Sequence, residues 1–130
     1  MTDRRWKAIE RLVADFWGGT RNPTSGEMSK HGTHADILRV RGVYIEVKHG
    51  ASVPTSFAKR DALWMDTREK AEAEGRVPVL VLHPKRLRDP VEAWPTIVEL
   101  PVSGGVMVQV PQVVARELVG TFIPYPRIPK

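Results

Sequence analysis

The sequence predicts an α/β fold, and three observations indicate it. Near the N-terminus, apolar residues recur at three- and four-residue steps, as on one face of a helix. Short runs of alternating apolar and polar residues flank Gly42, which is typical of a β-hairpin. A continuous apolar run from Val77 to His83 indicates a strand buried on both faces of a sheet. At 130 residues the chain fits one domain, residues 1–130, whose core needs no disulfide or metal to fold.

Composition excludes several classes of protein and favours one class of partner. The chain has no cysteine, which excludes disulfides and cysteine-ligated metal centres and fits a reducing cytosol. No apolar run approaches the ~20 residues of a membrane span, so we expect no membrane partner. We expect a cytoplasmic location, with the nucleoid or, for a viral protein, the host cell as alternatives. The formal charge of +5 favours a polyanionic partner such as nucleic acid through counterion release.

The first predicted element is an amphipathic helix from Asp3 to Trp17, which Gly18 and Gly19 end. Glu10 lies at the margin of its apolar stripe, where it can reach the sheet on which the helix packs. A surface glutamate at the edge of a packed helix is the alternative. The predicted stripe comprises Trp6, Ile9, Val13 and Phe16, widened by Leu12 and Trp17.

The predicted hairpin runs from His34 to His49, with its turn near Val40 to Gly42. A three-residue turn pairs Asp36 with Glu46, and two facing carboxylates repel each other. A divalent cation with hard oxygen ligands, such as Mg²⁺, would remove the conflict. A solvated sheet face with a surface Glu-Lys pair is the alternative. In this register Asp36, Glu46 and Lys48 share one face, and Ala35, Ile37, Ile45 and Val47 share the buried one.

Residues 20–33 form a loop rich in glycine, serine, asparagine and proline, longer than most connections inside compact domains. We interpret it as a DNA-contacting loop. Ser25 and its neighbouring amides would donate to a phosphate, while Arg21 and Lys30 supply charge. A flexible surface loop is the alternative. A histidine metal site is a further alternative with no recognised spacing, and it would use His31, His34 and His49.

The second half of the chain supplies the remaining predicted elements. Ser56 caps a helix from Phe57 to Glu74, which Gly75 ends. We expect its packed face to contain Ala58, Ala62 and Met65, with Phe57, Trp64 and Ala71 beside them. After the buried strand come a hairpin of Thr96–Leu100 and Val106–Val110, a helix from Pro111 to Val119 that stops at Gly120, and an extended proline-rich tail at 123–130.

The spacing of the acidic residues resembles that of a nuclease superfamily. Asp36, nine intervening residues and then Glu46-Val47-Lys48 resemble the core of the PD-(D/E)XK nucleases. The surroundings resemble the archaeal-type Holliday junction resolvases of that superfamily, in which a Glu-Arg pair and an Arg-x-Pro-x-Ser-Gly loop precede the core. Here the pair is Glu10-Arg11 and the loop is Arg21-Asn22-Pro23-Thr24-Ser25-Gly26. The resemblance covers residues 1–85, with Ala35 where the family pattern has proline.

The resemblance implies a restriction-endonuclease-like α/β/α core with a mixed central sheet flanked by helices, forming a single nuclease domain. It implies Mg²⁺, for which Mn²⁺ can substitute, bound by Glu10, Asp36, Glu46 and the carbonyl of Val47. Lys48 would position or activate the hydrolytic water and, with the three carboxylates, form the catalytic set. The DNA contacts would be Arg11, Arg21, Ser25 and Lys30.

The implied activity is paired hydrolysis of phosphodiesters in a four-way (Holliday) junction by a two-fold homodimer, because symmetric cleavage needs two active sites. Two alternatives stay open. One is another nuclease of the same superfamily, either restriction-like or a recombination exonuclease. The other is a basic DNA-binding protein without catalysis, whose binding would depend strongly on salt.

Overall fold

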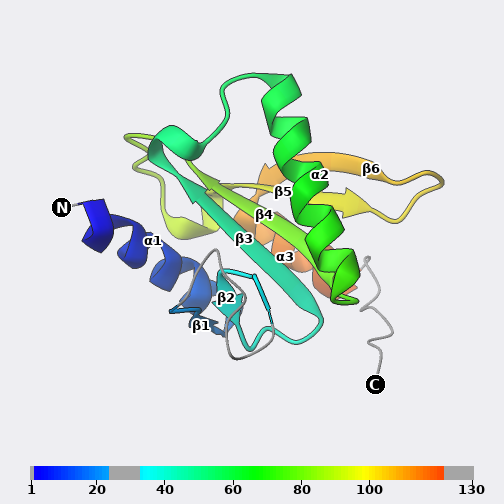
Figure 1. The fold of residues 1–130 in the computed structure, drawn as a ribbon, viewed down its shortest axis with the longest axis horizontal. Helices are drawn as coiled ribbons and strands as arrows, with labels where there is room; N and C mark the ends of the chain where they lie inside the picture. Colours follow the sequence, from blue (N-terminus) through cyan, green and yellow to red (C-terminus); the bar gives the residue numbers. More distant parts are fainter. Residues whose placement is uncertain (1, 24–32, 122–130) are drawn as a thin grey trace.

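The computed structural model describes residues 2–23 and 33–121, and the side chains of this part from residue 5 onward. It is a mixed α/β fold (Figure 1), as predicted. Ser25, Lys30, His31 and the tail at 123–130 lie outside the described residues. The elements are α1 (Thr2–Trp17), β1 (Thr20–Arg21), β2 (Ile37–Leu38), β3 (Val43–His49), η1 (Gly50–Ser52), α2 (Phe57–Ala73), β4 (Val77–His83), η2 (Val91–Ala93), β5 (Pro95–Leu100), β6 (Val106–Pro111) and α3 (Gln112–Thr121).

The main sheet is mixed and has the strand order β3-β4-β5-β6. The first two strands run parallel, and α2 forms the crossover between them. Their register pairs Val43 with Val77 and, six residues later, His49 with His83. β5 runs antiparallel to β4, and β6 runs antiparallel to β5. The carboxyl ends of β3 and β4 therefore meet at one edge of the sheet.

Helices cover both faces of this sheet (Figure 1). On one face Val79 and Val81 of β4 pack in a core with residues of α1 and α3. On the other face Leu80 and Leu82 pack with Trp64 of α2. The residues Val79 to Leu82 are all buried, which confirms the prediction of a strand covered on both faces. The result is a three-layered arrangement in which α2 lies opposite α1 and α3.

The first helix matches its predicted range but not its whole predicted stripe. Ile9 and Val13 are buried, as expected, whereas Leu12 is exposed. The buried arc also includes Glu10 and Ala14, on the side of the helix away from Leu12. The helix is therefore rotated so that the glutamate faces the interior rather than the margin.

The second helix begins as predicted but packs through a different face. Ser56 Oγ accepts a hydrogen bond from the Lys59 amide at 3.2 Å, which confirms the cap. The packed residues are Trp64, Thr67 and Ala71, while Phe57 and Met65 are 75% and 55% exposed. Ala58 and Ala62 are exposed as well, so of the six predicted residues only Trp64 and Ala71 are packed as expected, and the other four were wrong. Because apolar residues are spread around this helix, their spacing did not single out one face.

The N-terminal hairpin differs most from its prediction. β2 pairs antiparallel with β1, not with β3, whose sheet partner is β4. Gly42 has φ of +75°, as the predicted turn requires, but Arg39 also has a left-handed φ of +69°. The extended backbone therefore ends directly after β2, before a ladder with β3 can form. Ala35 packs with Tyr44 and Ala71, not with Ile45 and Val47.

The C-terminal elements follow the prediction closely. β5 and β6 form the expected hairpin, each one residue longer than predicted. α3 begins after Pro111 and continues through Gly120 to Thr121, rather than stopping at the glycine. Within residues 2–23 and 33–121, no helix combines the length and apolar character needed to cross a bilayer.

Candidate functional site

The site is built on β3 and on the segment that precedes β2. Alternation along β3 sends Val43, Ile45 and Val47 into the core with α1 and α3, so Glu46 and Lys48 lie on the opposite face. Asp36, only 5% exposed, joins this strand through two hydrogen bonds. Its amide donates to the Ile45 carbonyl at 3.0 Å, and its Oδ2 accepts from the Val47 amide at 2.7 Å. The backbone on both sides of Glu46 thus fixes the Asp36 carboxylate.

Glu46 is shielded from water, and its pKa is raised above the ordinary value of a glutamate. Its side chain is 12% exposed, and its Oε2 lies 3.4 Å from Lys48 Nζ. Burial and then the charge of Asp36 raise the pKa of Glu46 from 4.5 to about 7, against the opposing charges of Lys48 and Lys70. Both carboxylates are shielded from water, which disfavours the solvated face of the alternative interpretation, although its Glu46–Lys48 ion pair is present.

Glu10 is buried in an ion pair with another predicted site residue. Arg21 Nε donates to Glu10 Oε1 at 2.9 Å, and the guanidinium carbon lies 4.9 Å from the ring centre of Trp6. Arg21, predicted as a DNA contact, therefore holds a predicted metal ligand. Arg11 is exposed on α1 and available to a partner.

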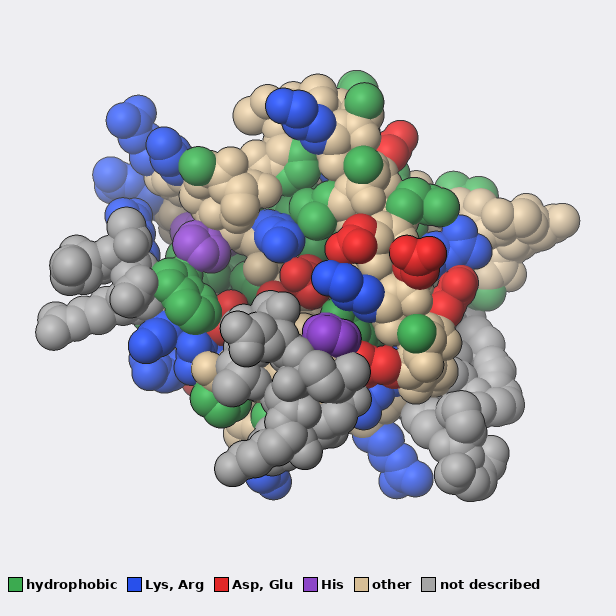
Figure 2. All heavy atoms as spheres, viewed as in Figure 1, with side chains coloured by type: hydrophobic (Ala, Val, Ile, Leu, Met, Phe, Trp, Pro, Cys, Tyr) green, Lys and Arg blue, Asp and Glu red, His purple; other side chains and the backbone are tan. Residues whose placement is uncertain are grey.

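The structure brings Asp36, Glu46 and Lys48 together but not the whole predicted set. In the part of the chain that the structure describes, no three His, Asp or Glu side chains are grouped closely enough to hold one metal ion. A ligand set that also includes Glu10 and the Val47 carbonyl stays a prediction. Figure 2 shows acidic side chains alternating with lysines and arginines over the face that α2 and β3 share.

A cavity of about 630 Å³ lies at the carboxyl ends of β3 and β4, where the sequence predicted no site. Its histidines, His49 and His83, are the paired last residues of the two parallel strands. The available signal was a histidine at the end of each run, the second followed by Lys85 and Arg86. The two histidines could be recognised as one site only once the parallel pairing of β3 with β4 was known.

The two imidazoles stay uncharged more readily than free histidine. Burial is the largest cause that lowers the pKa of both His49 and His83. The nearby Lys48 lowers the pKa of His49 further, against Asp36, and Arg5 does so for His83. Arg5 therefore acts electrostatically on the end of β4.

No protein-family model matches the chain, and comparison with curated proteins and with solved structures finds no significant match. The resemblance to the junction resolvases therefore stays a prediction. Function has to be inferred from the residues and geometry described above.

Proposed function

We propose that this protein is a Mg²⁺-dependent DNA endonuclease with a restriction-endonuclease-like core. The observation that carries the proposal is the pair of shielded carboxylates, Asp36 and Glu46, with Lys48 beside them. A structural role does not require two like charges in one shielded corner, because each raises the cost of ionising the other.

The two carboxylates suit a hard divalent cation. Mg²⁺ is commonly held by one or two carboxylates together with waters and substrate phosphates, and Mn²⁺ accepts the same oxygen ligands. A cation between Asp36 and Glu46 would offset their repulsion and favour the ionised form of Glu46. Glu10 and the Val47 carbonyl are the further ligands that the family resemblance adds.

The residues of the chain have distinct roles in this proposal. Asp36 and Glu46 would hold the cation, which when bound would supply a Lewis acid for the attacked phosphodiester. Lys48, anchored through Glu46, orients the attacking water and neutralises charge that develops on the phosphate. Because the Val47 amide fixes Asp36, the carboxylate keeps its place against Glu46 and Lys48.

A four-way junction is the substrate we propose, cut by a homodimer with one site facing each of two matching strands. The resemblance of Glu10-Arg11 and of the loop at 21–26 to the junction resolvases supports this choice, as does the charge of +5. A nuclease acting on linear DNA is the competing proposal, since the same carboxylates would serve it.

Cleavage of a synthetic four-way junction and of a matched linear duplex tests the proposal. Wild type, Glu46→Gln and the control Glu69→Gln, which removes an exposed α2 carboxylate, are compared in Mg²⁺ and in EDTA. We expect paired symmetric nicks from wild type and the control, and none from Glu46→Gln or with EDTA. Cleavage of the linear duplex alone would overturn the junction as substrate. Unimpaired cleavage by Glu46→Gln would overturn the site.

A further inference from the structure

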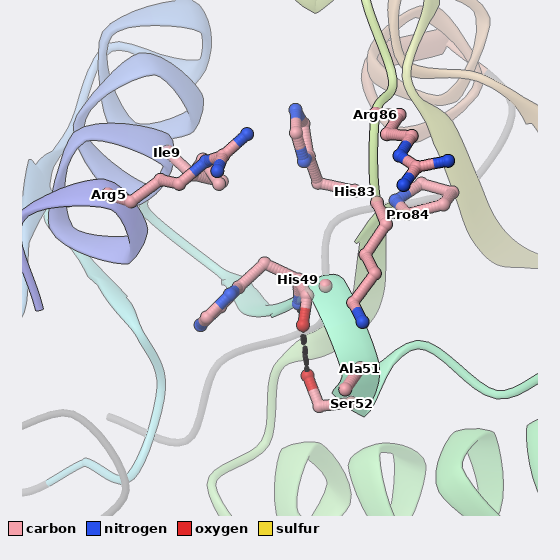
Figure 3. A pocket seen from close by; sticks show the side chains of 10 residues that line it. Arg5, Ile9, His49, Ala51, Ser52, His83, Pro84 and Arg86 are labelled. Atoms are coloured by element: carbon pink, nitrogen blue, oxygen red, sulfur yellow. Dashed lines mark hydrogen bonds between the residues drawn. The ribbon is translucent and has the colours of Figure 1, made fainter. Parts of the chain in front are cut away.

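The cavity at the ends of β3 and β4 combines three elements that are far apart in the sequence. Arg5 comes from α1, His49 ends β3 and leads into η1, and His83 ends β4 before Lys85 and Arg86. Figure 3 shows Arg5, His49 and His83 around one open space between α1 and the end of β4. Ligands of parallel α/β sheets bind in such crevices outside the carboxyl ends of the strands.

The charged side chains that line the cavity are all positive. Arg5, Lys85 and Arg86 line it, and among the side chains that the structure describes no aspartate or glutamate does. None of these three cations forms an ion pair within the described residues. Figure 2 shows lysine and arginine side chains gathered over the loop that follows β4. Like-charged groups around a hollow repel one another, so an anion entering it would be stabilised by all three.

The histidines are held in place from outside the cavity. The ring of His49 lies parallel to Trp6, with 6.3 Å between ring centres. The ring of His83 meets Trp94 edge to face at 4.5 Å. Each aromatic neighbour belongs to a different part of the fold, so the imidazole positions are set before any ligand arrives. Neutral imidazole still offers one N–H donor to an anionic oxygen.

We propose that this cavity binds a phosphate group of a DNA strand, as a second phosphate site beside the carboxylate pair. His49 and Lys48 point to opposite faces of β3, and the two faces meet at η1, where Ala51 and Ser52 line both this cavity and the hollow beside Lys48. A strand that passes Lys48 and continues over η1 would meet Arg5, Lys85 and Arg86 with another of its phosphates. The inference rests on the proposed function only in taking the phosphate to belong to a DNA strand. The cavity and its positive charge do not depend on that function.

DNA binding without metal isolates this site from cleavage. The Lys85→Gln/Arg86→Gln variant removes two cavity charges, and the control Arg41→Gln/Arg88→Gln removes two exposed charges outside the cavity. Anisotropy of a labelled duplex is measured in EDTA over a range of salt concentrations, and thermal melts verify that each variant is folded. A parallel titration with thymidine 5′-monophosphate, and with thymidine lacking the phosphate, follows the backbone amides of Gly50 and Ala51.

We expect the cavity variant to lose roughly tenfold or more in affinity and about 0.9 in the salt slope, because the cavity contacts one phosphate and each phosphate contact contributes about 0.9. The control should lose less than half of that slope. The nucleotide, not the nucleoside, should shift the Gly50 and Ala51 amides, and the cavity variant should abolish the shift. Equal losses in the two variants, or a nucleotide that leaves these amides unmoved, would overturn the proposal.

The inference and the proposed function can fail separately. If wild type binds DNA through the cavity but does not cut it in Mg²⁺, the nuclease proposal fails and the phosphate site stands. If wild type cuts DNA and both double variants bind alike, the nuclease stands and the phosphate site fails.

Discussion

Replacing Glu46 with glutamine should change how the stability of the protein depends on pH. Burial and Asp36 raise the pKa of this carboxyl to about 7 in the folded protein, against 4.5 as its ordinary value. The folded state therefore holds the proton more tightly than the unfolded state. The resulting stabilisation is complete below pH 4.5 and is lost as the pH rises through 7. Glutamine keeps the shape of the side chain and cannot ionise.

The size of the effect follows from the displacement of the pKa. The pKa rises from 4.5 to about 7. At 1.36 kcal/mol for each pKa unit, wild type should lose up to about 3 kcal/mol of unfolding free energy that Glu46→Gln keeps. Groups such as His49 and His83 titrate in both proteins and cancel in the difference.

Urea unfolding of both proteins at pH 5 and pH 8 measures this difference. We expect wild type to lose more stability than Glu46→Gln between the two values, and Mg²⁺ at pH 8 to restore stability to wild type only. Restoration follows because a bound cation favours the ionised form of Glu46. The same pH dependence in both proteins would refute the account of Glu46, and equal effects of Mg²⁺ would refute its role as a ligand.

Three further substitutions test the packing around the site by urea unfolding. Tyr44→Phe should raise the unfolding free energy by about 1 kcal/mol, because the buried hydroxyl lacks a hydrogen-bond partner in the described residues; a loss of stability would contradict this. Trp64→Ala should lower the unfolding free energy by about 3–5 kcal/mol, whereas Met65→Ala, at the exposed neighbour, should lower it by about 0.5 kcal/mol at most. Similar losses in the two variants would refute the observed packing of α2. Ser56→Ala should cost about 1 kcal/mol through the lost α2 cap, whereas no change would show that the cap adds nothing.

Elements marked by local signals could be predicted from the sequence. Ser56 and Gly75 mark the two ends of α2, and the run at 77–83 predicts β4 with its true bounds. The packed face of α2 depends on its orientation over the sheet, which residues distant in the sequence decide. The strand partner of β3 is equally non-local, since its alternation fits a hairpin with β2 or a parallel pairing with β4.

In the candidate site, too, local sequence predicted some contacts, and others depended on the folded structure. The meeting of Asp36 and Glu46 followed from ten residues of local sequence, although the actual link is a side-chain bond to the Val47 amide rather than a strand ladder. The pairing of Glu10 with Arg21 required the rotation of α1, which the stripe did not define. The cavity required the register of His49 against His83, which only the folded sheet supplies.

The in-register pairing of β3 with β4 limits where the length of this chain can change during evolution. Deleting one residue inside β4 would exchange Val79 and Val81 with Leu80 and Leu82 between the two cores, and would move His83 away from His49. The exposed loop at 101–104, between β5 and β6, carries no such constraint. Natural insertions and deletions should therefore collect in that loop and be absent from β4.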